Sequence, residues 1–354
     1  RADHFLGPRL SSGLGVLRET SRAILRDVTP EINDRISRGL VIDGHGDLRL
    51  EHIRLLEDRI DVIDCIEFSD AFRTIDVLND VAFLSMELTA LGYERLAGLF
   101  LEHYLKGFPD AASPQLLGWF SAYRAMVRVK VGLMRLEQLS DADDAHAQIE
   151  RVERLIGIAG RSLVLSQPMI IATAGLMGVG KSSIAEGLAQ LLSLSVIATD
   201  AVRHEVFADQ FAAPDAGRSA FGAGLYTADA RGAVYEAVRA KVSAELSQGR
   251  SVIVDASFSE QDERSRMRAL GREHGAKTLF IHCVLDDAVL RERLRKRSAA
   301  HAETPSLSDG RIELLDSQKA AFAEFAPDEP VVVVDTSQEI AEQLRAVFRN
   351  LTGK

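Results

Sequence analysis

The chain contains the stretch Gly175-Leu176-Met177-Gly178-Val179-Gly180-Lys181-Ser182, which fits the pattern G-x-x-x-x-G-K-[ST] of phosphate-binding loops. Its glycines allow a tight turn that points backbone N–H groups at phosphate oxygens. Lys181 supplies a positive charge to the β and γ phosphates, and the Ser182 hydroxyl completes the shell of a Mg²⁺ ion. Together with Ser183, this stretch predicts a binding site for ATP and Mg²⁺.

The sequence on either side of this loop has the order strand, loop and helix. Residues 169–174 form a short apolar run typical of a buried strand, and residues 182–192 carry apolar side chains on one helical face. Strands are expected at 169–174, 195–199, 251–255, 278–284 and 330–335, and helices at about 182–192, 230–247, 260–273, 286–298, 308–323 and 337–350. Continuous β-branched runs joined by helical crossovers predict an α/β fold with a five-stranded parallel sheet flanked by helices.

Length and composition are those of an ordinary globular chain. Its 354 residues are enough for two domains. The formal net charge of −10 argues against a broad nucleic-acid surface, although it is compatible with a local basic groove. Cys65 and Cys283 lie in apolar strand-like runs and are expected to be buried, reduced thiols of a cytoplasmic protein. No membrane span or secretory signal is expected, and the start at Arg1 indicates either processing or a fragment of a longer product.

The first part of the chain has a different, mostly helical character. Apolar residues recur at helical spacing in the segments 77–91, 93–106 and 116–136, and a small hairpin is expected from residues 53–56 and 60–66. The acidic, alanine-rich segment Ser140–Ala147 predicts a boundary. We therefore expect a protein-kinase-like helical domain at 1–140, a linker with a connecting helix at 141–168, and a P-loop domain at 169–354.

Acidic side chains follow two strands of the predicted sheet. Asp200 follows the second strand with Arg203 one helical turn farther on, so the carboxylate can accept the proton of an attacking hydroxyl while the arginine holds the transferring group. An N-cap aspartate beside a solvent-facing arginine is the simpler interpretation. Asp255 ends a strand of Walker B type, where it could hold Mg²⁺ through water, bind the acceptor hydroxyl, or serve only as a turn residue.

A basic helix precedes the polar loop Ser298–Gly310. In small P-loop kinases a lid of this kind delivers arginines to phosphate oxygens once water is excluded. We expect Arg293 and Arg297, one helical turn apart, to reach inward, and the other two arginines, Arg291 and Arg295, to lie on a solvated helix face.

Further motifs of the second half are Phe221–Thr227, Val234-Tyr235, Gly249–Phe258, Arg291–Arg297 and Ser308-Asp309 up to Gln318. With them, residues 169–350 resemble the ATP-binding half of the bifunctional aminoglycoside phosphotransferase/ATP-binding protein family, which is similar to zeta toxins and polynucleotide 5′-hydroxyl kinases. The resemblance implies that Asp200 activates an acceptor hydroxyl, that Arg203 contacts phosphate and that lid arginines engage the nucleotide. It leaves the acceptor open.

The first half contains Gly44-His45-Gly46-Asp47-Leu48, and Ile63–Phe68 follows the expected hairpin. Over about residues 35–135 this pattern resembles the catalytic loop and the metal-binding aspartate of aminoglycoside phosphotransferases. The resemblance implies Asp47 as a catalytic base and Asp64 as a Mg²⁺ ligand, and Asp76 and Asp80 as residues that brace the loop.

Two features depart from that family. His52 stands where the family has asparagine, and imidazole is a poor ligand for Mg²⁺. Only about forty residues precede the motif, too few for the N-terminal lobe that holds ATP in those kinases. We therefore expect a catalytic lobe without its nucleotide-binding lobe and Asp47 as a vestigial base, with independent activity more plausible if the chain is cut from a longer protein.

The sequence thus favours an ATP- and Mg²⁺-dependent phosphotransferase that acts on a hydroxyl of a small molecule. A polynucleotide 5′-hydroxyl acceptor stays open, because a basic groove could be lined by Arg203, His204, Arg218 and Arg231. A non-catalytic ATP-binding switch is a second class of function, and drug modification by the first half is a third. The sequence leaves the oligomeric state open.

Overall fold

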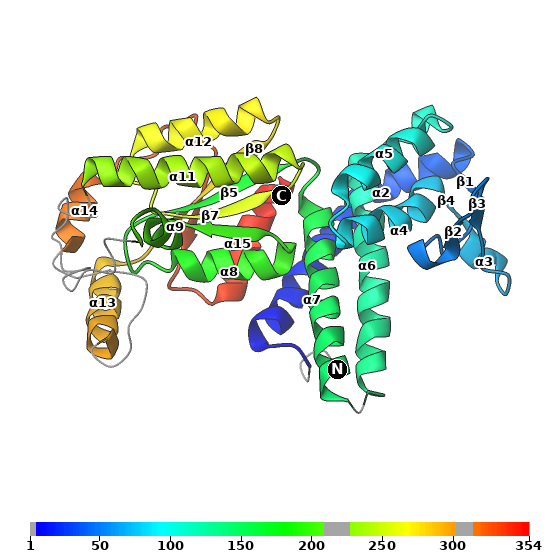
Figure 1. The fold of residues 1–354 in the computed structure, drawn as a ribbon, viewed down its shortest axis with the longest axis horizontal. Helices are drawn as coiled ribbons and strands as arrows, with labels where there is room; N and C mark the ends of the chain where they lie inside the picture. The colour runs from blue at the N-terminus through cyan, green and yellow to red at the C-terminus, as the bar shows by residue number, and fades with distance from the viewer. Residues whose placement is uncertain (1–4, 140, 209–226, 302–313, 354) are drawn as a thin grey trace. The chain divides into compact units, whose positions relative to one another are not determined.

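The chain folds into two compact units. The computed structural model describes residues 5–139, 141–208, 227–301 and 314–353 (Figure 1). The first unit comprises residues 1–166 with 190–193 and 351–354, and the second comprises residues 167–189 and 194–350. None of the helices within the described ranges is long and apolar enough to cross a membrane.

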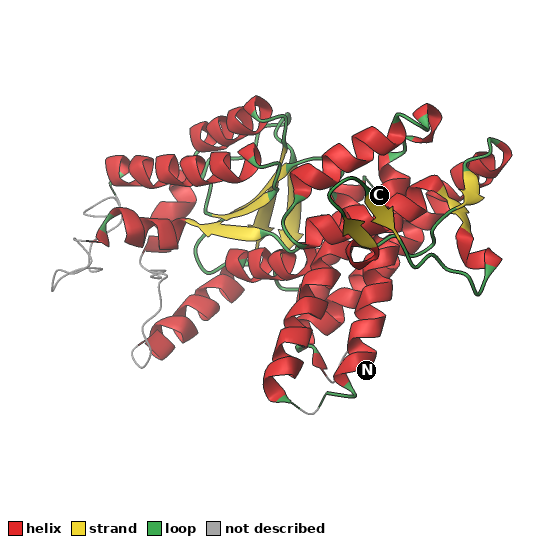
Figure 2. Ribbon diagram, turned by 45° about the vertical axis from the view of Figure 1, so that its right-hand side comes forward, coloured by secondary structure: helices red, strands yellow, loops and turns green. Residues whose placement is uncertain are grey.

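The first unit is mostly helical, as expected (Figure 2). Its α-helices are α2 (Pro8–Ser37), α3 (Asp70–Arg73), α4 (Val77–Ala90), α5 (Glu94–Leu105), α6 (Pro114–Leu136) and α7 (Ala142–Val164). Two short 3₁₀ helices are η1 (Leu50–His52) and η2 (Pro109–Ala111). Two small antiparallel pairs join β1 (Val41–Asp43) to β4 (Thr74–Asp76) and β2 (Ile53–Leu55) to β3 (Ile60–Val62). The second pair is the predicted hairpin.

The helix that we expected to connect two domains belongs to the first unit. The acidic segment that suggested a boundary begins α7, where Asp141 caps the helix by accepting from the N–H groups of Asp143 and Asp144. The apolar face of α7, which includes Val152, packs along α6 and is buried there. Acidic residues are common in the first turn of a helix because they interact favourably with its dipole. The charge run that suggested a linker is therefore a helix start.

The second unit is an α/β layer structure. Its strands are β5 (Met169–Ala174), β6 (Ser195–Ala198), β7 (Val252–Asp255), β8 (Lys277–Val284) and β9 (Val331–Asp335). Its helices are α8 (Lys181–Leu192), α9 (Thr199–Val206), α11 (Ala228–Ser247), α12 (Gln261–Glu273), α13 (Asp287–His301), α14 (Leu315–Ala321) and α15 (Ile340–Thr352). All five strands are parallel, in the order β6-β7-β5-β8-β9, which confirms the predicted sheet.

Helices cover both faces of this sheet (Figure 1). On one face, apolar side chains of α11 and α12, such as Val238 and Met267, join the buried strand residues in one core. On the other face lie α8 and α15, and Gly187 of α8 brings its backbone close to Leu344 of α15. Because both faces are covered, the strands are apolar along their whole length rather than at alternate positions. Because β6, β7 and β5 are adjacent and parallel, their carboxyl ends lie together at one edge of the sheet.

One of the two cysteine predictions is wrong. Cys283 in β8 is a buried thiol, as expected, and burial raises its pKa to about 12. Cys65 is also free, but it is exposed, because β3 ends at Val62 and the apolar run continues as an open loop. Apolar composition alone does not distinguish a buried strand from such a loop.

A buried arginine ties α12 to the segment before β9. The Arg264 guanidinium donates to both carboxylate oxygens of Glu329, at 2.8 and 3.1 Å. It also donates to the main-chain oxygens of Phe258, Ala323 and Glu324. Both partners of the ion pair are almost completely buried. Removal of one partner would leave a charge in the core without compensation.

We expect Arg264→Met to lower the free energy of unfolding of the second unit by about 3–5 kcal/mol, since Glu329 would keep a buried, unpaired charge. Arg268→Met is the matched control, because Arg268 lies on the same helix and pairs at 3.1 Å with Asp328, which is largely exposed. A pair of this kind contributes up to about 1 kcal/mol. Calorimetric unfolding of the two variants makes the comparison, and equal losses in both would contradict the prediction.

Candidate active site

The glycine loop lies between β5 and α8, as predicted. Gly175, Gly178 and Gly180 have φ values of +131°, +73° and +105°, which side-chain-bearing residues rarely adopt. There is also no room for a side chain at Gly175, because a Cβ there would lie 2.6 Å from the carbonyl oxygen of Cys283. The loop therefore needs glycine for its backbone angles and for its close approach to β8.

Side chains and backbone from distant segments hold this loop in place. The N–H of Gly175 donates to the Ser257 carbonyl at 3.0 Å, and the Thr336 hydroxyl donates to the Val179 carbonyl. The side-chain oxygen of Gln318 accepts from the N–H of Met177 at 2.8 Å. The loop is thus positioned by the segments that follow β7 and β9 and by α14.

Lys181 lies at the first position of α8, beside the loop. Its ammonium donates to the carbonyl oxygen of Leu176 at 2.8 Å, so the positive charge stays over the loop. Ser182 and Ser183 follow in the first turn and are exposed. Their N–H groups belong to the free amino end of the helix, where anions are stabilised.

Asp255 at the end of β7 is the centre of a small polar network. One of its carboxylate oxygens accepts from the Ser182 hydroxyl at 2.6 Å, and the other accepts from the Thr173 hydroxyl at 2.9 Å. Its carbonyl oxygen accepts from the Thr199 hydroxyl at 3.2 Å. Asp255 therefore connects the P-loop serine, β5 and the start of α9.

Asp200 and Arg203 lie in the first turns of α9, directly after Thr199. The Arg203 guanidinium donates to the Asp200 carboxylate at 2.6 Å. The Asp200 side chain keeps 43% of its surface exposed, whereas that of Arg203 keeps 16%. The carboxylate is thus oriented by its arginine and open to a ligand, on the edge of the sheet that carries Asp255.

The described arginines of α13 differ in their contacts. Arg293 donates to the main-chain oxygen of Thr336 at 2.9 Å, so it reaches the segment that holds the P-loop. Arg291 pairs with Asp287 at 2.9 Å and also with Asp316. Arg295 lies 3.7 Å from Glu292. The side chain of Arg297 and residues 302–310 of the expected lid loop lie outside the described part of the chain.

Three residues that contact the site were absent from the sequence-based list. Thr173 and Thr336 lie within or next to strands that the sequence did predict, so their places near the loop could have been inferred from topology. No sequence signal pointed to Gln318 as a ligand of the P-loop backbone, although it fell in a recognised motif. Its role depends on a contact with Met177, which lies more than a hundred positions away in the sequence.

The residues present fit the ligands that the loop implies. The hydroxyl of Ser182 and the carboxylate of Asp255 supply hard oxygen donors 2.6 Å apart. Within the described ranges there is no group of three or more His, Cys, Asp or Glu residues that could hold a metal. Mg²⁺ at nucleotide sites typically uses one or two protein oxygens, with phosphate and water as further ligands. Ser182 and Asp255 are therefore the residues that would hold it.

In the first unit, the His-Gly-Asp loop is braced as the sequence suggested, but by one aspartate. Asp80 accepts from the N–H groups of His45 and Gly46, at 2.7 and 3.0 Å. Asp76 instead caps α4 and forms a buried ion pair with Arg35 at 2.6 Å. Its part in the fold is to join α2 to α4.

His52 contacts both candidate catalytic aspartates of the first unit. Its Nδ1 lies 2.9 Å from the carbonyl oxygen of Asp47, and its Nε2 lies 3.2 Å from a carboxylate oxygen of Asp64. Asp64 has a φ of +61°, and its side chain is 75% exposed. Arg49 lies 3.5 Å from the Asp47 carboxylate. The imidazole thus lies between the Asp47 backbone and the Asp64 carboxylate.

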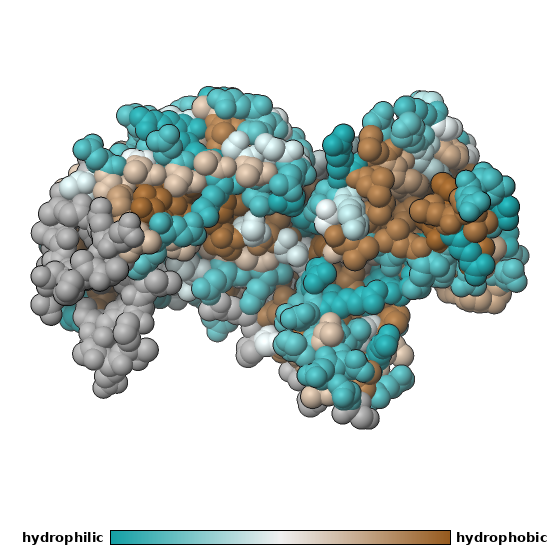
Figure 3. All heavy atoms as spheres, in the orientation of Figure 1, coloured by the Kyte–Doolittle hydropathy of each residue, from teal (hydrophilic) through white to brown (hydrophobic). Residues whose placement is uncertain are grey.

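Large apolar side chains are exposed near this loop. On the face drawn in Figure 3, apolar residues gather over α5 and the small strands of the first unit. Exposed large apolar residues between positions 55 and 72 are Leu55, Leu56, Ile60, Val62, Phe68 and Phe72.

The glycine loop between β5 and α8, at the edge of a five-stranded parallel sheet, defines the second unit as a P-loop domain. Residues 170–325 match a protein-family model described as an AAA domain. Uncharacterized proteins of Mycobacterium tuberculosis and Mycobacterium bovis are 32% identical to the chain over 269 residues, which are 76% of this chain and 53% of theirs. The chain therefore spans about half the length of the curated relatives it matches. The aligned stretch is longer than the second unit, so the similarity extends into the first.

Solved structures align with about half of the chain. A gluconokinase from Sinorhizobium meliloti is 24% identical, covers 52% of this chain and 93% of its own, and has a TM-score of 0.39. An APS kinase from Mycobacterium tuberculosis, in complex with AMPPNP and APS, is 20% identical, covers 52% of this chain and 98% of its own, and has a TM-score of 0.37.

Proposed function

We propose that the second unit is an ATP- and Mg²⁺-dependent kinase that transfers the γ-phosphoryl group to a hydroxyl of a small molecule. The observation that carries the proposal is the meeting of three parts at one edge of the sheet. These parts are the glycine loop with Lys181, the Ser182–Asp255 pair and the open Asp200 carboxylate held by Arg203. A nucleotide-binding switch needs the first two parts, whereas an oriented base beside them is what transfer to a hydroxyl requires.

Each of these residues has a distinct task in the proposed reaction. The N–H groups of residues 178–183 and the Lys181 ammonium bind the phosphates. The Asp200 carboxylate accepts the proton of the acceptor hydroxyl, and Arg203 keeps that carboxylate oriented and contacts the transferring group. Bound at Ser182 and Asp255, Mg²⁺ would neutralise charge on the phosphates. Arg293 supports the loop through Thr336, and Arg297 remains a candidate lid arginine.

Charge pairing supports a small-molecule acceptor over a polynucleotide. Of the residues that could line a basic groove, Arg203 is paired with Asp200, and Arg231 lies 2.6 Å from Glu260. Arg218 lies outside the described residues. Arginines that already have carboxylate partners contribute little net attraction to a phosphate backbone. The overall charge of −10 acts in the same direction.

We also propose that the first unit derives from an aminoglycoside-phosphotransferase-like lobe. Support comes from the His45–Asp47 loop that Asp80 braces, from the hairpin after it and from Asp64 beside His52. Asp64 could still contribute to a Mg²⁺ site, and Asp47 would be its base. The contact of His52 with both aspartates favours an altered site over an active one. We place the domain boundary after α7.

The acceptor can be found by incubating a metabolite extract with ATP that carries ¹⁸O in its γ-phosphate. We expect mass spectrometry to detect at least one small hydroxyl compound that gains the labelled phosphoryl group with the wild-type protein and not with Asp200→Asn. Asp262→Asn is the matched control, because Asp262 is an exposed residue on α12. Release of labelled inorganic phosphate without any labelled compound would favour a switch and contradict the proposal.

A further inference from the structure

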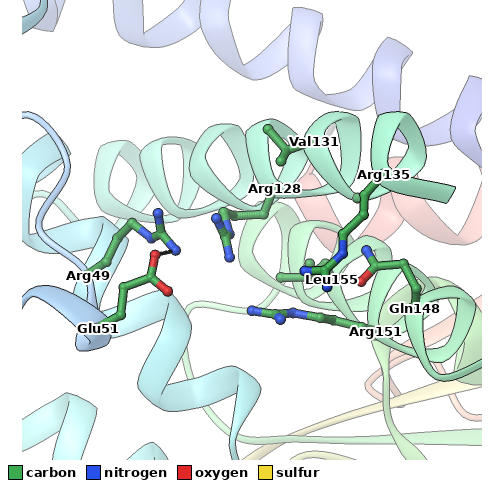
Figure 4. A pocket seen from close by; sticks show the side chains of 9 residues that line it. Arg49, Glu51, Arg128, Val131, Arg135, Gln148, Arg151 and Leu155 are labelled. Atoms are coloured by element: carbon green, nitrogen blue, oxygen red, sulfur yellow. Dashed lines mark ion pairs between the residues drawn. The ribbon is translucent and has the colours of Figure 1, made fainter. Parts of the chain in front are cut away.

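The first unit contains a pocket that neither the kinase proposal nor the His-Gly-Asp loop explains. Its volume is about 270 Å³, and it lies between η1 and the antiparallel helices α6 and α7 (Figure 4). The lining residues are Arg49, Glu51, Arg128, Val131, Gly132, Arg135, Gln148, Arg151 and Leu155. Four arginines from three segments therefore share one small space.

The positive charge of this pocket is only partly compensated. Arg49 pairs with Glu51 and lies 3.5 Å from the Asp47 carboxylate, and both Arg49 and Arg128 lie near Glu87, at 3.6 and 3.8 Å. Arg135 and Arg151, by contrast, have no carboxylate within 4.0 Å among the residues that the structure describes. The end of the pocket formed by α6 and α7 thus carries a surplus of positive charge.

A further observation shows that the arginines crowd one another. The pKa of Arg128 is lowered, first by burial and then by the neighbouring charges of Arg49 and Arg151, against the opposing effect of Glu87. The Nε atom of Arg49 is buried and faces a carboxylate oxygen of Glu87 at 3.6 Å, too far for a hydrogen bond.

A glycine keeps the floor of the pocket open. A Cβ on Gly132 of α6 would lie 2.6 Å from Nε2 of Gln148 and 2.7 Å from Cγ2 of Val152, both on α7. Any larger residue would push the Gln148 amide away or separate the two helices. The glycine thus lets α7 approach closely and leaves the amide of Gln148 on the pocket floor as a further polar group (Figure 4).

We propose that this pocket binds a small, multiply charged anion that carries phosphoryl groups. Planar guanidinium groups match phosphoryl oxygens in a bidentate manner, and several of them around one space select for more than one negative charge. The volume is below the usual range of about 300–1,000 Å³ for drug-sized ligands, which favours a compact ligand. A polycationic aminoglycoside would be repelled, so the ligand differs from what the resemblance of the first half implies.

Inorganic pyrophosphate is a suitable probe, and isothermal titration calorimetry measures its binding. The full chain with Lys181→Ala serves as the parent, so that the P-loop contributes little. We expect binding to weaken about tenfold for each arginine removed in Arg135→Gln/Arg151→Gln, since each loses a charge-assisted hydrogen bond. The matched control is Lys130→Gln/Arg154→Gln, which removes the same charge from the same two helices outside the pocket.

The outcomes separate this proposal from the kinase proposal. Pyrophosphate binding that survives Lys181→Ala and falls only in the arginine variant supports the pocket, whether or not the second unit phosphorylates anything. No binding in the Lys181→Ala parent, or equal loss in the control, would overturn it. Arginine-dependent binding of an oligothymidylate or of kanamycin in place of pyrophosphate would also overturn it.

Discussion

Replacement of Lys181 by alanine is expected to lower ATP turnover by at least about 100- to 1,000-fold, the usual effect of removing one preorganised group that stabilises charge in a transition state. The ammonium lies over the glycine loop, 2.8 Å from the Leu176 carbonyl, where the phosphates of a nucleotide would bind. Nucleotide affinity should fall as well, because the same charge acts on bound phosphates before transfer. Steady-state ADP release and nucleotide titration measure the two effects.

Lys277→Ala is the matched control for this variant. Lys277 begins β8 at the end of the strand remote from the P-loop, and it is exposed. Its removal changes the charge of the second unit by the same amount, but we expect no change in turnover beyond about twofold, in keeping with the small effect of exposed charges. Wild-type turnover by Lys181→Ala would place nucleotide binding elsewhere and remove the basis of the kinase proposal.

The second large effect is expected from Asp200→Asn. An amide keeps the size of the carboxylate but cannot accept a proton, so phosphoryl transfer should fall by about 100- to 10,000-fold. Nucleotide binding should stay within about twofold of wild type, because the groups that bind phosphate are unchanged. The measurements are transfer to the acceptor identified by mass spectrometry and the dissociation constant of ADP.

Arg203 adds a second way to examine the role of Asp200. Its guanidinium donates to the carboxylate at 2.6 Å, so Arg203→Lys should retain charge but lose the fixed fork geometry, and transfer should fall while ADP binding holds. Asp262→Asn, which alters an exposed carboxylate on α12, should behave as wild type. Equal transfer rates for Asp200→Asn and Asp262→Asn would exclude Asp200 as the base.

Much of the second unit could be predicted because its signals are local. The five strands were found within one or two residues of their observed ends, from continuous β-branched runs. The glycine loop was found from spacing alone, since the backbone angles of Gly175, Gly178 and Gly180 place strict demands on residue type. One local signal was misinterpreted. The acidic run at Asp141 suggested a linker, but Asp141 caps α7.

Contacts between residues that lie far apart in the sequence could not be predicted from such local signals. Nothing near Arg293 in sequence indicates that it donates to the carbonyl of Thr336, and nothing near Gln318 indicates Met177 as its partner. The arginine pocket is a similar case. Arg49 and Arg128 lie far apart in sequence, and Arg135 and Arg151 lie on two helices whose close approach depends on Gly132.

The sequence by itself determined the parallel sheet, the position of the phosphate-binding loop and the aspartates that follow the strands. These features depend on backbone angles, side-chain shape and short-range periodicity, which neighbouring residues set. Tertiary structure alone decided that Arg264 pairs with Glu329, that α7 packs along α6 and that four arginines share a pocket. Those outcomes depend on burial and on charges brought together by packing, and no short window of sequence contains both partners.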